Sequence, residues 1–166
     1  MRRFPILLGL LMMSLAAPTL AEEAPIPYGV GDTIEGFTLE DQHGDTGTVD
    51  ATTRVILFSR DMPGGDLLKE ALSDVQAEAL EARGAVYVSD ISGMPALVSR
   101  LMAVPAMRRR PYDLLLDRDG GVTARLPDAI RQATLIHLDA LRIERIEHAS
   151  DVPTIRASLG LEASAN

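Results

Sequence analysis

The chain has 166 residues, a formal net charge of −8 and no cysteine. Hydrophobic residues make up 46% of it and charged residues 24%, a balance typical of one globular domain. The acidic charge argues against nonspecific binding to nucleic acid or to anionic lipid surfaces, both of which need basic residues. The absence of cysteine excludes disulfide bonds, so the fold must be held together by its core.

The first residues have the pattern of a secretory signal. Arg2 and Arg3 precede an apolar stretch, and Thr19-Leu20-Ala21 offers a small-x-small cleavage site. The apolar stretch is short for a membrane-spanning helix, so we expect cleavage, no stable membrane insertion and a periplasmic protein. The predicted organisation is a signal peptide (1–21), a linker (22–27), one domain (28–160) and a loose tail (161–166).

The first elements of the predicted domain are strands. Alternating Phe37 and Leu39 predict a strand, followed by a turn at 42–45 and a second short strand that completes a hairpin. The run RVILFS at 54–59 is apolar and too short for a helix, which is typical of a buried parallel strand.

Two helices and a second buried strand are predicted next. The first helix is capped by Asp66 and stopped by Gly84, and its buried face carries Leu68, Leu72, Val75 and Ala79. The strand AVYVSDI then precedes a second helix that Pro105 ends or kinks, with Leu97, Val98, Leu101 and Met102 pointing inward. Met94, Met102 and Met107 are expected to fill gaps in the core rather than to bind copper.

The rest of the chain predicts a strand and turn in YDLLLDRDGG, two strands joined near Asp139-Ala140, and a terminal helix capped by Ser150 or Asp151. A strand, helix, strand and helix followed by a hairpin and a last helix imply a mixed sheet with helices on both faces.

Three segments resemble a known superfamily. VGDTIEGFTLEDQHGDTGTV is similar to the lead-in of peroxiredoxin-type domains, DLLLDRDGGVTARL to their late L-x-D-x-x-G segment, and ATLIHLD stands where they have P-x-x-F-x-I-D. Residues 28–160 therefore resemble the thioredoxin/peroxiredoxin-like superfamily, and most of all its small cysteine-free exported branch typified by YtfJ. The resemblance implies a thioredoxin-like three-layer α/β/α sandwich with a central mixed sheet and an N-terminal β-hairpin.

The chain departs from this superfamily at both halves of the thiol site. Where the family has its cysteine, the sequence reads Met62-Pro63-Gly64-Gly65. Where the family has a cis-proline, the register gives Ala133, with Pro111 as the rival position. Methionine cannot ionise, so thiol-disulfide exchange and cysteine-based peroxide reduction are excluded.

The resemblance implies a groove beside the first helix that serves binding in place of catalysis. We expect Met62, Pro63, Gly64, Gly65 and Ala133 to line this groove, with Arg108, Arg109 and Arg110 as a rim for an anionic partner. The predicted function is that of a non-catalytic binding or accessory protein with a protein or peptide partner and no cofactor.

Two acidic turns and two histidines keep another function open. Asp41, His43 and Asp45 in DQHGD, and the DRDGG segment at 117–121, contain metal-ligand residue types, but such residues more often form turns. The alternative to a binding module is a metal-binding protein or non-thiol enzyme that uses His43 or His137 with nearby carboxylates.

Overall fold

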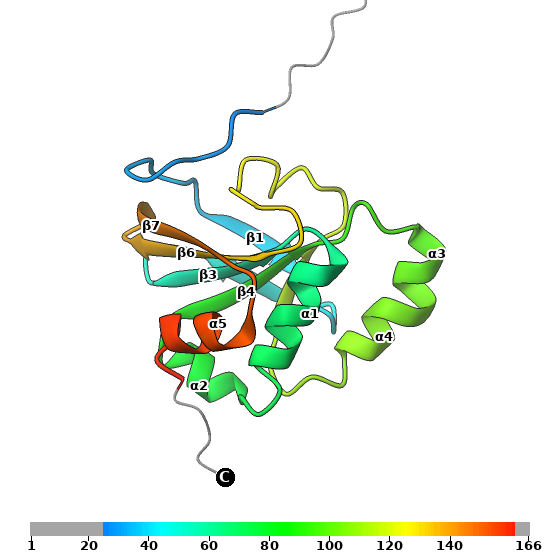
Figure 1. Cartoon of the computed structure of the whole chain (residues 1–166). Coiled ribbons are helices and arrows are strands. Elements are labelled where there is room, and N and C mark those ends of the chain that lie inside the picture. The colour runs from blue at the N-terminus through cyan, green and yellow to red at the C-terminus, as the bar shows by residue number, and fades with distance from the viewer. Residues whose placement is uncertain (1–24, 162–166) are drawn as a thin grey trace, which may run out of the picture.

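The computed structural model describes residues 25–161, so the predicted signal peptide, most of the linker and nearly all of the tail lie outside the described residues. Five strands form one mixed sheet in the order β5-β4-β3-β6-β7 (Figure 1). Their bounds are Val55–Ser59 (β3), Ala85–Asp90 (β4), Leu114–Asp117 (β5), Ala133–Asp139 (β6) and Arg142–Ala149 (β7).

The direction of the strands determines where polar side chains can gather. β3, β4 and β5 run parallel, with Ser59 opposite Ser89 and Asp90 opposite Asp117, whereas β6 and β7 run antiparallel to their neighbours. The carboxyl ends of the three parallel strands therefore meet at one edge of the sheet. In open α/β sheets this edge is where ligands bind.

Three helices cover one face of the sheet (Figure 1): Met62–Ala71 (α1), Ala77–Glu81 (α2) and Val152–Ser158 (α5). Leu68 and Leu72 pack with Ile155 against Leu57 and Leu135, all fully buried. The single helix predicted between Asp66 and Gly84 is wrong, because the chain breaks into α1 and α2 between them. The predicted apolar face survives the break, since Val75 in the connection is also buried.

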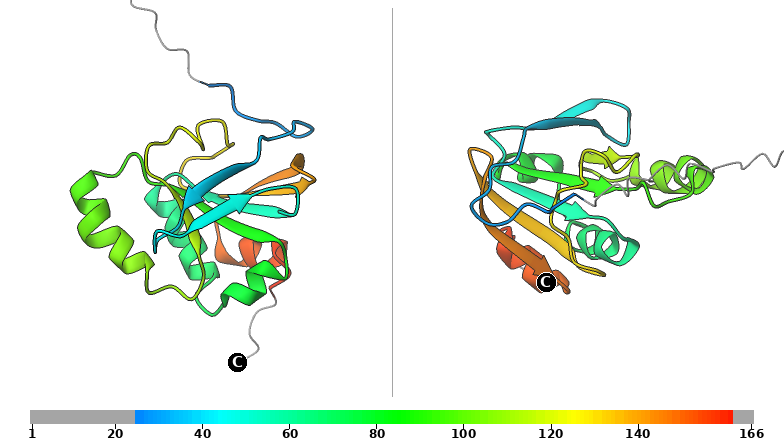
Figure 2. Two further views of the ribbon diagram at one scale, coloured as in Figure 1. Left: turned by 180° about the vertical axis from the view of Figure 1, so that it is seen from behind. Right: turned by 90° about the horizontal axis from the view of Figure 1, so that it is seen from above.

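The other face of the sheet is covered by an N-terminal hairpin and by loops, as the view from above shows (Figure 2). The hairpin consists of Phe37–Glu40 (β1) paired antiparallel with Thr46–Val49 (β2). Ile56, Phe58 and Ile136 of the sheet pack there against Ile34 and Val49, with Leu126 of the 118–131 loop beside them. The fold is thioredoxin-like, with the central mixed sheet and the N-terminal hairpin expected from the sequence.

One helical segment stands beside the sheet instead of on it (Figure 1). It comprises Ala96–Val98 (α3), the π-helical Ser99–Ala103 (η1) and Val104–Met107 (α4). The prediction that this helix points its apolar residues inward is wrong: Leu97, Val98, Leu101 and Met102 are all exposed, and Val104 alone is fully buried. The wider turn of η1 comes just before Pro105, whose ring would collide with a regular helical carbonyl, so the helix continues past the proline.

Within residues 25–161 every helix is too short or too polar to cross a bilayer.

Candidate functional site

The start of α1 is fixed by Asp61. Its Oδ1 accepts a hydrogen bond from the Gly64 amide at 2.8 Å, and its Oδ2 accepts another from the Arg131 amide. Asp61 is therefore the N-cap, and the predicted capping by Asp66 is wrong. Because the cap lies five residues earlier than expected, Met62-Pro63-Gly64-Gly65 form the first turn of the helix and not a loop before it.

The surroundings of Gly64 and Gly65 show that one side of this turn is tightly packed and the other is open. A Cβ on Gly64 would collide with the carbonyl oxygen of Gln132, so α1 packs directly on the chain just before β6. Ala133, the next residue, is completely buried, so its side chain presents no surface to a ligand. A Cβ on Gly65 would instead meet only the Ser59 hydroxyl at 3.6 Å and the Tyr87 hydroxyl at 3.9 Å.

A cleft of about 420 Å³ opens on the Gly65 side, between the start of α1 and the α3–α4 segment. This volume falls in the range of small-molecule and peptide side-chain sites. Of the predicted groove residues, Met62 and Gly65 line the cleft, while Pro63, Gly64 and Ala133 do not. Its apolar wall is completed by residues that the sequence analysis placed elsewhere: Ile91, Met94, Pro95, Val98 and Met107.

The cleft is lined by the buried hydroxyl groups of Tyr87 and Ser89 on β4, and Ser59 at the end of β3 contacts both of them. Ser59 Oγ lies 3.4 Å from the Tyr87 hydroxyl and 3.3 Å from Ser89 Oγ. Burial raises the pKa of Tyr87, against smaller opposing effects of Ser59 and Arg110, so the phenol stays neutral. A neutral hydroxyl both donates and accepts, which gives the cleft hydrogen-bonding capacity without charge.

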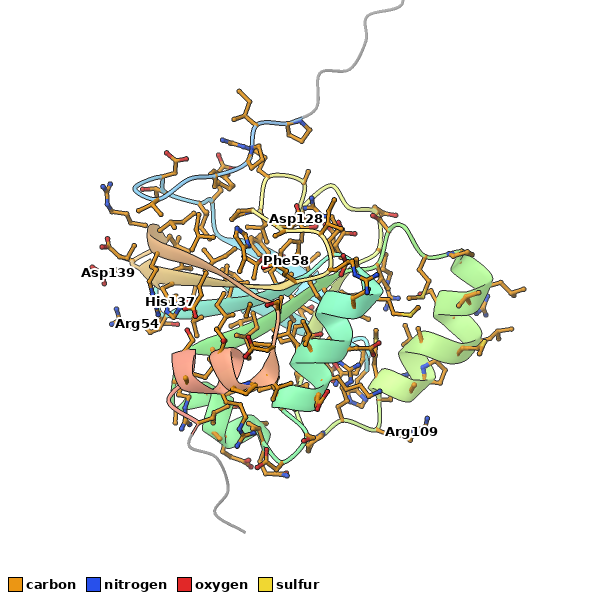
Figure 3. All side chains as sticks on the ribbon, in the orientation of Figure 1. Arg54, Phe58, Arg109, Asp128, His137 and Asp139 are labelled. Carbon is orange, nitrogen blue, oxygen red and sulfur yellow. The ribbon has the colours of Figure 1, made fainter. Side chains whose placement is uncertain are left out.

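The three arginines that were predicted to form a rim do not lie together in the structure. Arg108 donates from Nε to the Gln42 carbonyl at 2.8 Å, whereas Arg109 is exposed at the outer surface, far from His137 (Figure 3). Arg110 lines the cleft, with its guanidinium carbon 6.0 Å from the centre of the Tyr87 ring. Only Arg110 of the three is thus part of the same site as Met62 and Gly65.

A charged network that the sequence analysis missed closes the cleft at the sheet edge. Arg60, directly after β3, forms ion pairs with Asp90 at 3.1 Å and Asp128 at 2.7 Å, and donates to the Thr123 carbonyl at 2.7 Å. The Thr123 hydroxyl joins Asp90 to the buried Asp117, at 3.2 and 2.9 Å. The sequence contains a signal for this cluster. Arg60 follows β3, whereas β4 ends in Asp90 and β5 in Asp117, and the ends of parallel strands meet at one edge of the sheet.

The two acidic segments, DQHGD and DRDGG, form the turns that were predicted for them. Asp41 Oδ1 accepts hydrogen bonds from the amides of His43, Gly44 and Asp45, and His43 itself is exposed. Asp117 Oδ1 accepts from the amides of Asp119 and Gly120 in the same manner. Nowhere in residues 25–161 do three or more His, Asp or Glu side chains gather in a way that could hold a metal ion.

His137 lies far from the cleft, on the β6–β7 side (Figure 3). Its Nε2 accepts a hydrogen bond from Arg145 at 2.8 Å, and Ser158 Oγ lies 3.1 Å from the same atom. Burial and the positive charge of Arg145 lower the pKa of His137, and Glu147 opposes them only in part. The folded protein therefore favours the neutral ring.

This arrangement predicts a pH dependence of stability. Because the pKa is lower in the folded state, the unfolded chain binds the proton first as the pH falls below about 6.5, and stability is lost there. Replacing His137→Gln should reduce the difference in unfolding free energy between pH 7 and pH 5, measured by urea denaturation. The exposed His43→Gln serves as the control, and an unchanged difference in His137→Gln would contradict the assignment.

No protein-family model matches the sequence, and no curated protein matches it. Solved structures do match. Peroxidoxin BcpB from Mycobacterium tuberculosis is 20% identical, with a TM-score of 0.52 over 81% of this chain and 98% of that chain. The peroxiredoxin-like protein from Aquifex aeolicus is 10% identical, with a TM-score of 0.53 over 82% of this chain and 89% of that chain. A protein from Chlorobium tepidum assigned as thiol:disulfide interchange protein DsbE is 15% identical, with a TM-score of 0.54 over 80% of this chain and 93% of that chain.

These likenesses show the fold alone, because the identities are low. The chain is a cysteine-free protein of thioredoxin-like fold.

Proposed function

We propose that this chain is an exported, non-catalytic binding protein of the cysteine-free YtfJ-like branch, and that it holds a peptide segment of a partner protein in the cleft beside α1. The leader sequence supports export, with its two arginines, apolar stretch and small-x-small site. The missing thiol removes the chemistry known for this fold and leaves the cleft as a surface for binding.

The observation that carries the proposal is the amount of apolar surface left uncovered around the cleft. Met62 on one wall is 73% exposed, and Leu97, Leu101 and Met102 on the neighbouring helical segment are 69%, 63% and 68% exposed. Val98 belongs to both this segment and the cleft wall, so the two surfaces join. Contiguous apolar surface of this kind marks interaction sites, and methionine adapts its shape to varied partners.

The charge of the same segment indicates the chemistry of the partner. Residues 91–112 contain four arginines (Arg100, Arg108, Arg109 and Arg110) and no Asp or Glu, in a chain whose net charge is −8. A partner segment with apolar side chains and acidic groups is complementary to this surface, whereas the acidic remainder of the chain repels it.

A peptide-binding experiment tests the proposal. Peptides selected from a random library on the purified protein should be enriched in apolar and acidic residues, and their affinity can be measured by fluorescence anisotropy. Gly65→Leu places a side chain in the cleft above Ser59 and Tyr87, and it should weaken binding about tenfold or more. Met62→Asp should also weaken binding about tenfold or more. An aspartate is favourable in the first turn of a helix, and its charge would repel the acidic groups of the peptides.

The matched control is Gly121→Leu. Gly121 is exposed and a Cβ there meets nothing within 4 Å, so this variant should bind the selected peptides as the unmodified chain does. Thermal unfolding of each variant confirms that the fold is intact. Equal peptide affinity in the Gly65→Leu variant and its control would refute the cleft as the binding site.

The second function, a metal-binding protein or non-thiol enzyme built on His43 or His137, gains no support from the site. The two histidines lie apart, one exposed in the hairpin turn and the other on β6 beside Arg145.

A further inference from the structure

Arg110 is the one side chain in the cleft region whose bonding is incomplete. Its Nη1 atom is buried and has no hydrogen-bond partner among the described residues. The guanidinium lies over the Tyr87 ring, and the positive charge and hydrogen bonds of Arg110 act on the hydroxyls of Tyr87 and Tyr112, whose pKa values burial raises. No carboxylate in residues 25–161 forms an ion pair with Arg110, although other arginines of the chain have such partners.

A buried guanidinium nitrogen without a hydrogen-bond acceptor is costly, even though Arg110 as a whole is only half-buried. Removing a charge from water is repaid only by hydrogen bonds or by a charge of opposite sign, and aromatic rings supply a small part of this. The cost disappears when a ligand brings an anionic group, because arginine binds planar oxygen pairs with two parallel hydrogen bonds. The incomplete bonding therefore points to a ligand with a negative group.

The other groups of the cleft restrict what this anion can be. Asp61, Asp66 and Asp90 all line the cleft and disfavour a multiply charged phosphate. A carboxylate brings a single negative charge and fits the two nitrogen donors of the guanidinium. The wall beside Arg110 is apolar, with Met94, Val98 and Met107 among its residues, so the body of the ligand is apolar as well.

We infer that the cleft is a binding site for an aliphatic carboxylate, in which the carboxylate pairs with Arg110 and the hydrocarbon part lies along the methionine wall. The carboxylate comes either from the end or side chain of a bound peptide or from a free aliphatic acid. This inference rests on the proposed binding function and names the group that the site recognises.

Calorimetric titration of the purified full chain with sodium octanoate tests this inference, with 1-octanol as a neutral probe of the same length. Octanoate should bind about tenfold or more tightly than octanol. Arg110→Met, which keeps an unbranched apolar side chain, should remove this preference and leave octanol binding unchanged. Arg109→Met is the matched control and should behave as the unmodified chain, because Arg109 lies outside the cleft.

Two results would overturn the inference: equal affinity for octanoate and octanol, or an octanoate affinity that Arg110→Met does not change. A selected peptide with a free carboxyl terminus, compared with its amidated form, distinguishes the two sources of the carboxylate. If only the free-terminus peptide depends on Arg110, the source is a peptide end; if octanoate alone does, it is a free acid. Failure of the proposed binding function is a separate result: Gly65→Leu would then leave peptide binding unchanged, whatever Arg110→Met does to octanoate binding.

Discussion

Replacing Gly64→Ala should destabilise the protein by about 2 to 3 kcal/mol, although alanine is the better helix former. The reason is the contact between α1 and the chain before β6, where an added methyl group would collide with the Gln132 carbonyl oxygen. Gln132 leads directly into the fully buried Ala133, so neither backbone can move without disturbing the sheet. The unfolding midpoint in urea measures the loss.

Gly65→Ala is the matched control, one residue further along the same helix. Its methyl group would make ordinary contacts with Ser59 and Tyr87 at 3.6 and 3.9 Å, and the helix would gain about 0.5 to 1 kcal/mol from the loss of a glycine. The two changes should thus shift the midpoint in opposite directions. Equal effects would show that the junction of α1 and β6 is looser than the structure has it.

Replacing Arg60→Met should cost about 3 kcal/mol, because it leaves the buried Asp90 carboxylate without its cation. The Asp90 side chain is 6% exposed and the Arg60 side chain 33% exposed, so water can replace the lost interactions only in part. Asp117 and Thr123 depend on the same network through shared hydrogen bonds. The measurement is again the free energy of unfolding, at pH 7.

The surface pair Arg54–Asp139 provides the control for this experiment. It has a comparable distance, 2.9 Å, but its side chains are 61% and 71% exposed, so Arg54→Met should cost less than about 1 kcal/mol. Adding Asp90→Asn to the Arg60→Met variant should recover part of the loss, since it removes the unpaired charge. A loss of the same size at Arg54 and at Arg60 would contradict the structural role of the network.

The sequence was sufficient to predict the fold because its signals are local. The apolar run at 54–59 and the alternating pattern of residues 133–149 became β3, β6 and β7 as expected. The turns at Asp41 and Asp117 were also predictable, because Asp binds the amides that follow it wherever the chain turns. The order of these elements predicted a mixed sheet, and the resemblance to the superfamily supplied the thioredoxin-like architecture.

The candidate site was less predictable, because it depends on contacts between segments that are far apart in the sequence. Leu97 and Leu101 have the spacing of a buried helix face, but the sheet beneath is already covered by α1, so the apolar face stays in solvent. The unpartnered Nη1 atom of the half-buried Arg110 likewise comes from the position of this residue beside Tyr87, a neighbour 23 residues away in sequence whose proximity no local pattern reveals. Met62 and Gly65, which line the cleft, were predicted as site residues only because the resemblance marked their position.

The bonding of Asp61 has a consequence for any attempt to return a sulfur nucleophile to this chain. A reactive thiolate at position 62 would rely on free amide groups and on the positive end of the helix. Both are already engaged by the Asp61 carboxylate, which binds the amides of Gly64 and Arg131 and adds a negative charge next to position 62. Met62→Cys alone would therefore yield an ordinary surface cysteine. Introducing thiol chemistry at this junction would therefore require a change at position 61 as well.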